Sequence, residues 1–242
     1  RRARREGGRE SMSLAAAVLS GFLLAALAPL VHRFAGRRSG WILALLPAGL
    51  AAYLGSLAPA VWRGEVLIER IAWAPELDLS LSLRLDGLSL LFALLISAMG
   101  AVVTVYAGGY LAGHPRLGRF HATLMFFMAS MLGVVLADNL ILLFIFWELT
   151  SISSYLLIGF DHEREKARKS ALQALLVTGG GGLALLAGVV VVGQVGGSFE
   201  LADLFERAEL VQSHYLYVPL TAMILLGAFT KSAQFPFHFW LP

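Results

Sequence analysis

The sequence contains no cysteine and few charged residues, and both shortages narrow what this protein can do. Without thiols it has no disulfides, no thiolate nucleophile and no cysteine-ligated cluster. Its six histidines do not form the close histidine and carboxylate spacing of a zinc or iron site. The glycine run at 179–182 lacks the Lys-Ser/Thr pair of a phosphate-binding loop, so it predicts close helix packing or a flexible point. We therefore expect neither a metal nor a cofactor.

The low charge content goes with long apolar stretches, because 58% of the residues are hydrophobic and only 14% are charged. A helix needs about 20 apolar residues to cross a bilayer core of about 30 Å. These stretches are continuous rather than alternating, which favours helices over a barrel. The sequence predicts an all-α polytopic membrane protein with about seven transmembrane helices. The predicted segments are Leu14–Leu30, Trp41–Val61, Gly87–Leu111, Phe120–Leu136, Leu140–Phe160, Ser170–Val192 and Leu216–Trp240.

The positive charges between these segments predict the orientation of the chain in the membrane. Nine Lys and Arg residues fall in one set of loops and four in the other, so the richer set is expected in the cytoplasm. The nine are Arg33, Arg37, Arg38, Arg116, Arg119, Arg164, Lys166, Arg168 and Lys169. The four are Arg63, Arg70, Arg84 and Arg207.

Residues 1–11, RRARREGGRES, conflict with this orientation because they add five arginines to the outer side. Met12 is followed at once by an apolar run, so we expect translation to begin there and residues 1–11 to be a non-native or disordered tail. Without the tail the formal net charge falls from +3 to zero, and the basic pI then gives no reason to expect a nucleic-acid partner. Alternatively, the tail binds anionic lipid on the cytoplasmic face, which would require the inverse topology.

Two outer segments have patterns of their own. Residues 63–86 alternate apolar and polar side chains on either side of Pro75, which predicts two short strands and a small periplasmic β-hairpin on the membrane surface. Residues 198–212 have helical spacing and predict one short surface helix. Asp138 precedes the fifth apolar segment and is expected to cap that helix. We interpret these segments as connectors or contacts to other proteins of a complex.

Two charged residues, Glu148 and Lys231, lie inside apolar segments. A charge at that depth costs several kcal/mol, so such a residue indicates a functional site, with each charge as the other's partner. Ser151 and Tyr155 share the face of Glu148 and Ser154 is adjacent, so hydroxyls that can hold water extend from the carboxylate. A cation that moves toward or away from this carboxylate would release or bind a proton. The alternative is a glutamate that only holds two helices together.

The sequence after Lys231 predicts a broken helix. Pro236 cannot donate to the carbonyl of Ser232, and it biases Phe235 away from helical geometry. We expect the seventh helix to break just after Lys231, near Pro236, and its freed backbone groups to line a hydrated cavity. The alternative is a simple proline kink with a lysine that reaches toward the interface. His238 lies beyond the break and is a candidate proton relay.

Two motifs carry a resemblance to a known family. FFMASMLGVVLADNLILLFIFWELTSISSYLLIGF and TKSAQFPFHFWLP resemble the antiporter-like subunits shared by Mrp-type cation/proton antiporters, respiratory complex I and membrane-bound hydrogenases. The wording WELTSISSYLLIGF is most similar to the large subunit, designated A, of the Mrp antiporter. The resemblance covers most of 87–242 and implies that Glu148 is the family's acid on the fifth helix. It also implies that Lys231 is the partner lysine on a broken seventh helix.

The resemblance also sets expectations for the organisation of the chain. Family members have about fourteen helices built on inverted repeats, so this chain corresponds to the first half of such a module. We expect residues 12–85 to hold the first two helices and the outer loop. Residues 86–242 would form a truncated proton-translocating half-module, which makes the chain an N-terminal fragment.

The function that follows from the resemblance is that of a secondary transporter subunit rather than an enzyme. It would form part of a proton path in a multisubunit Na+/H+ antiporter of the bacterial inner (plasma) membrane. Its partners would be the other subunits, the lipid bilayer, protons and monovalent cations. Two alternatives stay open: a proton-pumping membrane subunit of an NADH:quinone oxidoreductase or hydrogenase, and a non-conducting scaffold. The sequence contains no dedicated cation cage that would select sodium over potassium or lithium.

Overall fold

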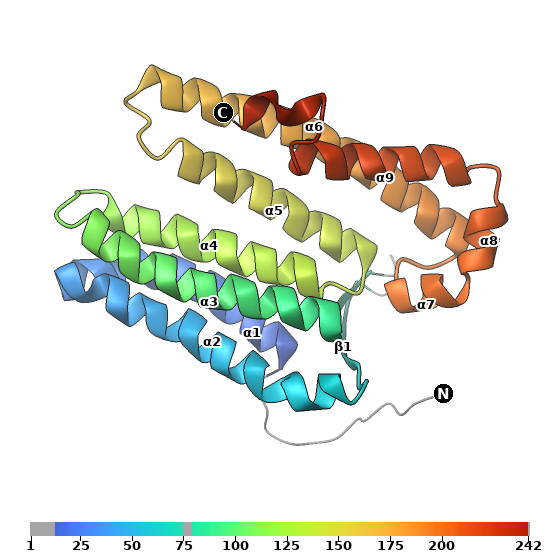
Figure 1. Cartoon of the computed structure of the whole chain (residues 1–242), viewed down its shortest axis with the longest axis horizontal. Helices are drawn as coiled ribbons and strands as arrows, with labels where there is room; N and C mark the ends of the chain where they lie inside the picture. The colour runs from blue at the N-terminus through green and yellow to red at the C-terminus, as the bar shows by residue number, and fades with distance from the viewer. Residues whose placement is uncertain (1–12, 75–78, 242) are drawn as a thin grey trace.

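Long helices lying side by side make up most of the molecule (Figure 1). The computed structural model describes residues 13–74 and 79–241, so the expected tail at 1–11 lies outside the described residues. The long helices are α1 (Leu14–Ala35), α2 (Ser39–Trp62), α3 (Gly87–Tyr110), α4 (Leu117–Leu136), α5 (Leu140–Ile158), α6 (Glu165–Gly196) and α9 (Tyr217–Lys231). The shorter elements are η1 (Gly36–Arg38), β1 (Leu67–Ala74), β2 (Leu79–Leu85), α7 (Leu201–Glu206), α8 (Ala208–Ser213) and η3 (Phe237–Trp240).

Each of the seven predicted apolar stretches overlaps one of the long helices, and the seventh, Leu216–Trp240, extends past the end of α9 into η3. Five spans of the described chain are long and apolar enough to cross a membrane, and the first of them, Leu14–Trp62, contains α1, η1 and α2. The apolar helix α9 is shorter, at 15 residues. The prediction of a mostly helical, multi-pass membrane protein is therefore confirmed.

The loops separate into two groups at opposite ends of the helices (Figure 1). One end carries η1, the α3–α4 loop and the α5–α6 loop, and the nine basic residues assigned above to one side lie in these segments or in the adjoining helix ends. The other end carries the two strands, the α4–α5 turn and the short helices α7 and α8. This is the grouping that the topology prediction requires. Lys166, Arg168 and Lys169 nevertheless lie on α6 rather than in a loop, because that helix begins at Glu165, earlier than predicted.

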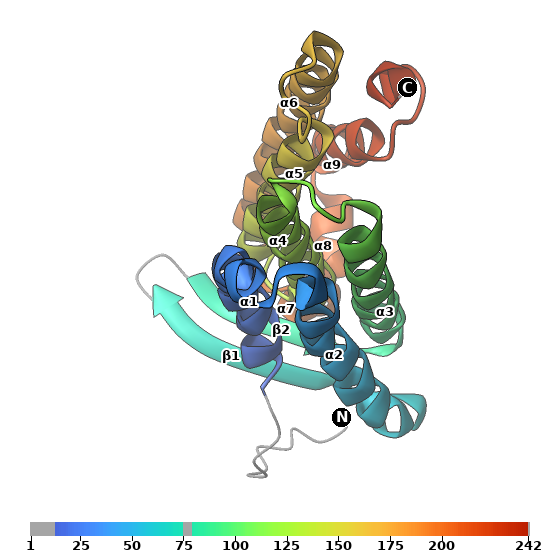
Figure 2. The same ribbon diagram turned by 90° about the vertical axis from the view of Figure 1, so that its left-hand side faces the viewer.

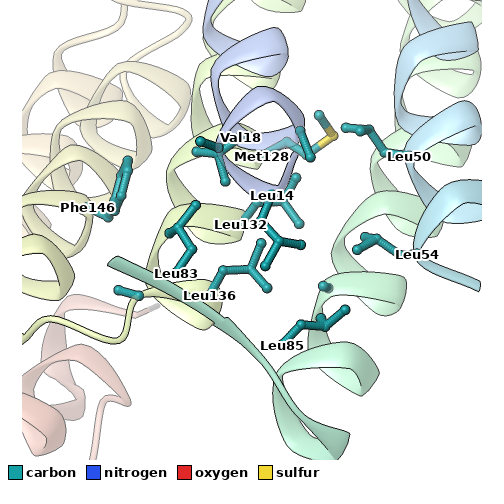
Figure 3. Close-up of a cluster of buried hydrophobic side chains, with 14 of the residues drawn as sticks. Leu14, Val18, Leu50, Leu54, Leu83, Leu85, Met128, Leu132, Leu136 and Phe146 are labelled. Atoms are coloured by element: carbon teal, nitrogen blue, oxygen red, sulfur yellow. The ribbon is translucent and has the colours of Figure 1, made fainter. Parts of the chain in front are cut away.

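The two strands pair antiparallel, with Leu67 opposite Leu85, as a hairpin requires. The Pro75 break predicted between them falls outside the described residues. Leu83 and Leu85 of β2 are fully buried and pack with side chains of α1 and α4, among them Leu14 and Leu136 (Figure 3). The hairpin is therefore fixed to the end of the bundle by its apolar face.

Asp138 does not cap α5, contrary to the prediction from sequence. The N-cap is Asn139, whose side-chain oxygen accepts hydrogen bonds from the backbone N–H groups of Ile141 and Leu142. The Asp138 carboxylate instead faces Arg70 and Arg84 of the hairpin. Asn and Asp cap helices about equally well, so local propensity cannot choose between adjacent candidates. A tertiary charge contact decides the choice here.

The segment 198–212 forms two short helices, α7 and α8, where the sequence predicted one. Arg207 separates them, and its guanidinium donates a 2.8 Å hydrogen bond to the carbonyl of Gly196 at the end of α6. That carbonyl is one of the unpaired groups that every helix end leaves. Capping α6 with a side chain from this segment interrupts the local helix.

The apolar core is concentrated on one side of the molecule. A large cluster joins α1, α2, α3, α4 and β2, with Phe146 of α5 at its border (Figure 3). The side formed by α6 and α9 has only a small buried cluster, made of Val192, Leu204 and Leu220. Glycines take over part of the packing there: a methyl group at Gly188 would lie 2.7 Å from Ile224. Close backbone contact, rather than large side chains, brings α6 and α9 together.

Candidate functional site

Glu148 lies midway along α5 and points toward α6. Its Oε1 atom is buried and has no hydrogen-bond partner among the described residues. A methyl group at Gly182 would collide with that same oxygen, so the carboxylate occupies the space that the glycine leaves free. A methyl group at Gly181 would likewise collide with the side chain of Thr230 on α9. Gly181 and Gly182 of the run at 179–182 therefore allow close helix packing, one of the two roles predicted, and Gly182 leaves room for the buried acid.

Lys231 is the last residue of α9 and reaches across to α5. Its Nζ donates a 2.8 Å hydrogen bond to the hydroxyl of Ser151 and a longer one, 3.4 Å, to the carbonyl of Trp147. The ammonium also lies 5.3 Å from the centre of the Trp147 ring, within range of a cation–π contact. The negative end of the α9 dipole favours a cation at this position. Hydroxyl, carbonyl, ring and dipole together replace part of the hydration that the charge loses.

The Lys231 ammonium lies against the face of α5 that carries Glu148, but the two charged groups do not touch. Ser151, which binds the lysine, lies three residues after Glu148 and therefore on the same face. Within the described chain, no ion pair joins the carboxylate to the ammonium. The structure thus brings together the predicted pair, with the lysine held by a hydroxyl beside the acid.

The helix break after Lys231 is present, and its geometry is that of a Schellman motif. The N–H of Gln234 donates to the carbonyl of Phe229 at 2.9 Å, and the N–H of Ala233 donates to that of Thr230 at 3.4 Å. Ala233 has a φ of 52°, in the left-handed region where glycine is usual. At 15 residues, α9 is about 22 Å long, shorter than a bilayer core of about 30 Å. The helix that ends at Lys231 is therefore too short to cross a bilayer core by itself.

Two hydrogen bonds hold the segment after the break against the helices. The indole N–H of Trp240 donates to the carbonyl of Thr230 at 2.9 Å, and the Gln173 amide of α6 donates to the carbonyl of Phe239 at 3.0 Å. The first satisfies a carbonyl at the end of α9, which a backbone in lipid requires. The turn of helix η3 thus folds back over α6 (Figure 1).

A cavity of about 120 Å³ lies beside the lysine, between α4, α5 and α6. Its polar lining consists of Thr150, Ser151, Ser154, Tyr155, Thr178 and Lys231. At about 30 Å³ for each molecule, this volume has room for about four waters. The predicted polar stripe at Ser151, Ser154 and Tyr155 does line a cavity. Sequence reasoning missed Thr150 and Thr178, which also lie on α5 and α6 and are nearly buried.

The third predicted site residue, His238, does not join this group. It lies in η3 with an exposed side chain, and its ring stacks on Phe235 with 5.8 Å between centroids. The lining of the cavity includes Lys231 and neither His238 nor Glu148. Glu148, however, lies on the same face of α5 as the Ser151 that binds the lysine. The structure therefore gathers Glu148 and Lys231 at one place and leaves His238 outside.

A second group of charges, which sequence reasoning missed, lies at the hairpin end. Asp138 is fully buried, 3.7 Å from Arg70 and 3.8 Å from Arg84. Arg70 also pairs with Glu200, whose side chain accepts a hydrogen bond from Asn139. Burial raises the pKa of the Asp138 carboxyl, the charge of Glu200 adds to this, and the two guanidinium groups only partly oppose it. The cluster joins the hairpin to the turns before α5 and α7.

Comparison with known proteins assigns this arrangement to a family. Residues 137–242 match the family described as NADH:quinone oxidoreductase/Mrp antiporter, transmembrane region, and residues 72–121 match the N-terminus of chain 5 of complex I. The chain belongs to the family of antiporter-like membrane subunits that these two descriptions name.

Named relatives narrow the similarity to one kind of subunit. The chain is 44% identical over 228 residues to the subunit designated A in the Na+/H+ antiporter of Alkalihalophilus pseudofirmus, an alignment that covers 93% of this chain and 28% of that protein. It is 50% identical over 198 residues to a protein of Rhizobium meliloti named as the probable K+/H+ antiporter subunit designated A/B, covering 82% of this chain and 19% of that protein. The expected resemblance to the Mrp subunit designated A is confirmed. The chain spans less than a third of these relatives.

A solved structure agrees with the sequence relatives. The Mrp complex from Dietzia sp. DQ12-45-1b contains a chain that superposes on this one with a TM-score of 0.79 at 36% identity. The match covers 95% of this chain and 25% of the other. The arrangement of helices described above is therefore that of an Mrp-type subunit.

Proposed function

We propose that this chain contributes a proton-conducting half-path to a multisubunit cation/proton antiporter. Glu148 would be the group that binds and releases the proton, and Lys231 the charge that controls it. The observation that carries the proposal is that Lys231 of α9 binds Ser151 on the face of α5 that also carries Glu148, and that this lysine lines a cavity with further hydroxyl groups. A neutral amide at either position could hold the helices together at a lower free-energy cost than a charged group in the membrane.

Movement of the lysine would control the proton. An ammonium beside a carboxylate stabilises its ionised form, so approach of Lys231 would release the proton and withdrawal would allow another to bind. In this structure the ammonium is held by Ser151, which corresponds to the withdrawn position. The break at Ala233 ends α9 directly after the lysine, so a small change there would move Nζ between Ser151 and Glu148. His238 would relay protons only after a rearrangement of η3.

The proposed setting is the bacterial inner membrane, with about seven crossings in this chain. The end bearing η1 would face the cytoplasm, and the hairpin would be periplasmic, as the excess of basic residues indicates. In this arrangement Glu148, at the middle of α5, lies near the centre of the bilayer. Other antiporter subunits would be the partners, with sodium or potassium as the exchanged cation; the two named relatives differ on that cation.

A second candidate function is a proton-pumping subunit of a redox-driven complex. The family description that names NADH:quinone oxidoreductase beside the Mrp antiporter supports it. The same pair of residues would carry the proton in either system, and the energy source would differ. Genes for quinone- or hydrogen-linked subunits next to this gene would favour this candidate over antiport.

The test is sodium- or potassium-driven proton movement in vesicles that contain the complete complex. Glu148→Gln should abolish it, because an amide cannot carry the proton, while the complex still assembles. Glu165→Gln is the matched control, since Glu165 is exposed and paired with Lys169 on the surface of α6. Normal transport by the Glu148 variant would end the proposal. Loss of assembly instead of transport would favour the scaffold.

A further inference from the structure

A second cavity, larger than the one beside Lys231, lies away from the Glu148–Lys231 site. It has a volume of about 550 Å³ and opens between η1, the start of α2 and the end of α3. Figure 2 looks onto this end of the helices. Its walls are Arg37, Trp41, Tyr106 and Tyr110, and its floor contains Gly40 and Gly108. We call it the η1 pocket.

Two glycines shape the pocket by letting the helices touch. A methyl group at Gly40 would lie 3.0 Å from the carbonyl of Thr104 and 3.1 Å from the backbone of Gly108. With no side chains at the crossing, α2 and α3 meet backbone to backbone. The large side chains near these glycines, Trp41 and Tyr106, line the pocket.

The pocket carries positive charge that the protein does not neutralise. Arg33, Arg37 and Arg38 are exposed at the turn between α1 and α2. None of the three forms an ion pair with an acidic residue in the described part of the chain. By contrast, Arg116 and Arg164 at the same end are paired with Glu163 and Asp161. Three arginines without an ion pair in the described chain therefore gather at the η1 turn, and one of them, Arg37, lines the pocket.

The aromatic walls are typical of a membrane interface. Trp41, Tyr106 and Tyr110 are 68%, 64% and 75% exposed, and the two tyrosine rings stack 5.5 Å apart. Trp and Tyr concentrate at the level of lipid headgroups. Most of their apolar surface is left uncovered by the described part of the chain.

Below the aromatic walls, the pocket continues into an apolar face. Val102, Met99 and Leu95 follow Tyr106 at helical spacing along α3, and Leu45 follows Trp41 along α2. All four are more than half exposed. The groove is cationic at the interface and apolar along the helices, so it complements a phospholipid, which has an anionic headgroup and apolar acyl chains.

We propose that the η1 pocket binds an anionic phospholipid. The phosphodiester would lie against Arg37, with Arg33 and Arg38 adding to the attraction. The glycerol region would lie between Trp41 and Tyr106, and the acyl chains along the apolar faces of α2 and α3. A headgroup of this kind fits a pocket of about 550 Å³, within the usual range for small ligands. Charge complementarity and continuity with the apolar face favour a lipid over a protein segment.

The test measures phosphatidylglycerol bound to the complete protein, purified with the subunits that accompany it. Native mass spectrometry would titrate the delipidated protein with phosphatidylglycerol, and with phosphatidylcholine of the same acyl chains. Arg37→Gln should weaken phosphatidylglycerol binding about fivefold, the effect expected for one arginine at an anionic interface. Arg37→Lys, which keeps the charge, and Arg164→Gln, at the same end of the protein, should each bind within about twofold of wild type.

Three results would overturn the proposal. The first is equal phosphatidylglycerol binding by wild type and Arg37→Gln. The second is equal binding of phosphatidylcholine, which would mean that only acyl chains are recognised. The third is capture of a neighbouring protein of the complex, rather than lipid, by a photoreactive residue placed at Tyr106. The arginine and tyrosine positions are exposed, so their replacement should leave the fold intact.

Discussion

Replacing Gly182 with alanine should displace the Glu148 carboxylate and impair transport. The added methyl group would collide with Oε1 of Glu148, which is buried and has no hydrogen-bond partner among the described residues. Overpacking of this kind costs about 1–3 kcal/mol. Against it stands a gain of about 1 kcal/mol from exchanging glycine for alanine within a helix.

Gly180 provides the matched control for this prediction. It is exposed, and a methyl group placed there would meet nothing within 4 Å. Gly180→Ala should therefore show the propensity gain alone, and the Gly182 variant should be about 1–3 kcal/mol less stable than this control. Because proton transfer depends on position within about 1 Å, transport by the Gly182 variant should fall at least about tenfold.

The assay combines thermal unfolding in detergent with sodium-driven proton movement in vesicles of the complete complex. The reasoning predicts that Gly180→Ala is at least as stable as wild type and transports normally. Equal stability and equal transport of the two alanine variants would refute the proposed fit between Gly182 and Glu148.

Further predictions concern the lysine, the charge cluster and the helix break. Ser151→Ala should weaken transport about tenfold, because Lys231 would lose a hydrogen bond, and a hydrogen bond to a charged group contributes about 1.5–3 kcal/mol. Ser154→Ala, on the same cavity wall, should have little effect on transport. Equal losses of transport in the two variants would contradict this assignment. Asp138→Asn tests the raised pKa of the native carboxyl: a folded state that binds the proton more tightly loses stability as pH rises from about 4 through the folded pKa. Wild type should therefore lose thermal stability relative to Asp138→Asn over that range, and parallel curves would exclude the shift. Ala233→Gly should raise the free energy of unfolding in denaturant by about 1 kcal/mol, because glycine adopts a φ of 52° without strain. A destabilised variant would show that the left-handed backbone at Ala233 does not lower the stability of the native protein.

The sequence was sufficient for the features that depend on local chemistry. Apolar runs placed every long helix, and the alternating pattern around Arg70 placed the hairpin. Glu148 and Lys231 were identifiable because a charge inside an apolar segment is costly wherever the helix lies. The break after Lys231 was expected from Pro236, although the structure ends the helix with a turn at Ala233, before the proline.

Features that depend on contacts between distant segments could not be predicted. Asp138 and Asn139 are equivalent as caps, and only the arginines of the hairpin distinguish them. The role of Gly182 depends on which helix α6 packs against, and the glycine run alone left packing and flexibility open. His238 was grouped with the site by its distance along the chain, whereas the fold of η3 places it outside.

The most direct test of the central claim is a double-mutant cycle on transport. Glu148→Gln, Lys231→Ala and the double variant would be compared for sodium- or potassium-driven proton movement in vesicles of equal complex content. If the two charges work as one unit, the double variant loses no more activity than the more severe single variant. If the losses multiply, or if Lys231→Ala transports like wild type, the lysine does not control the proton on Glu148 and the account is wrong.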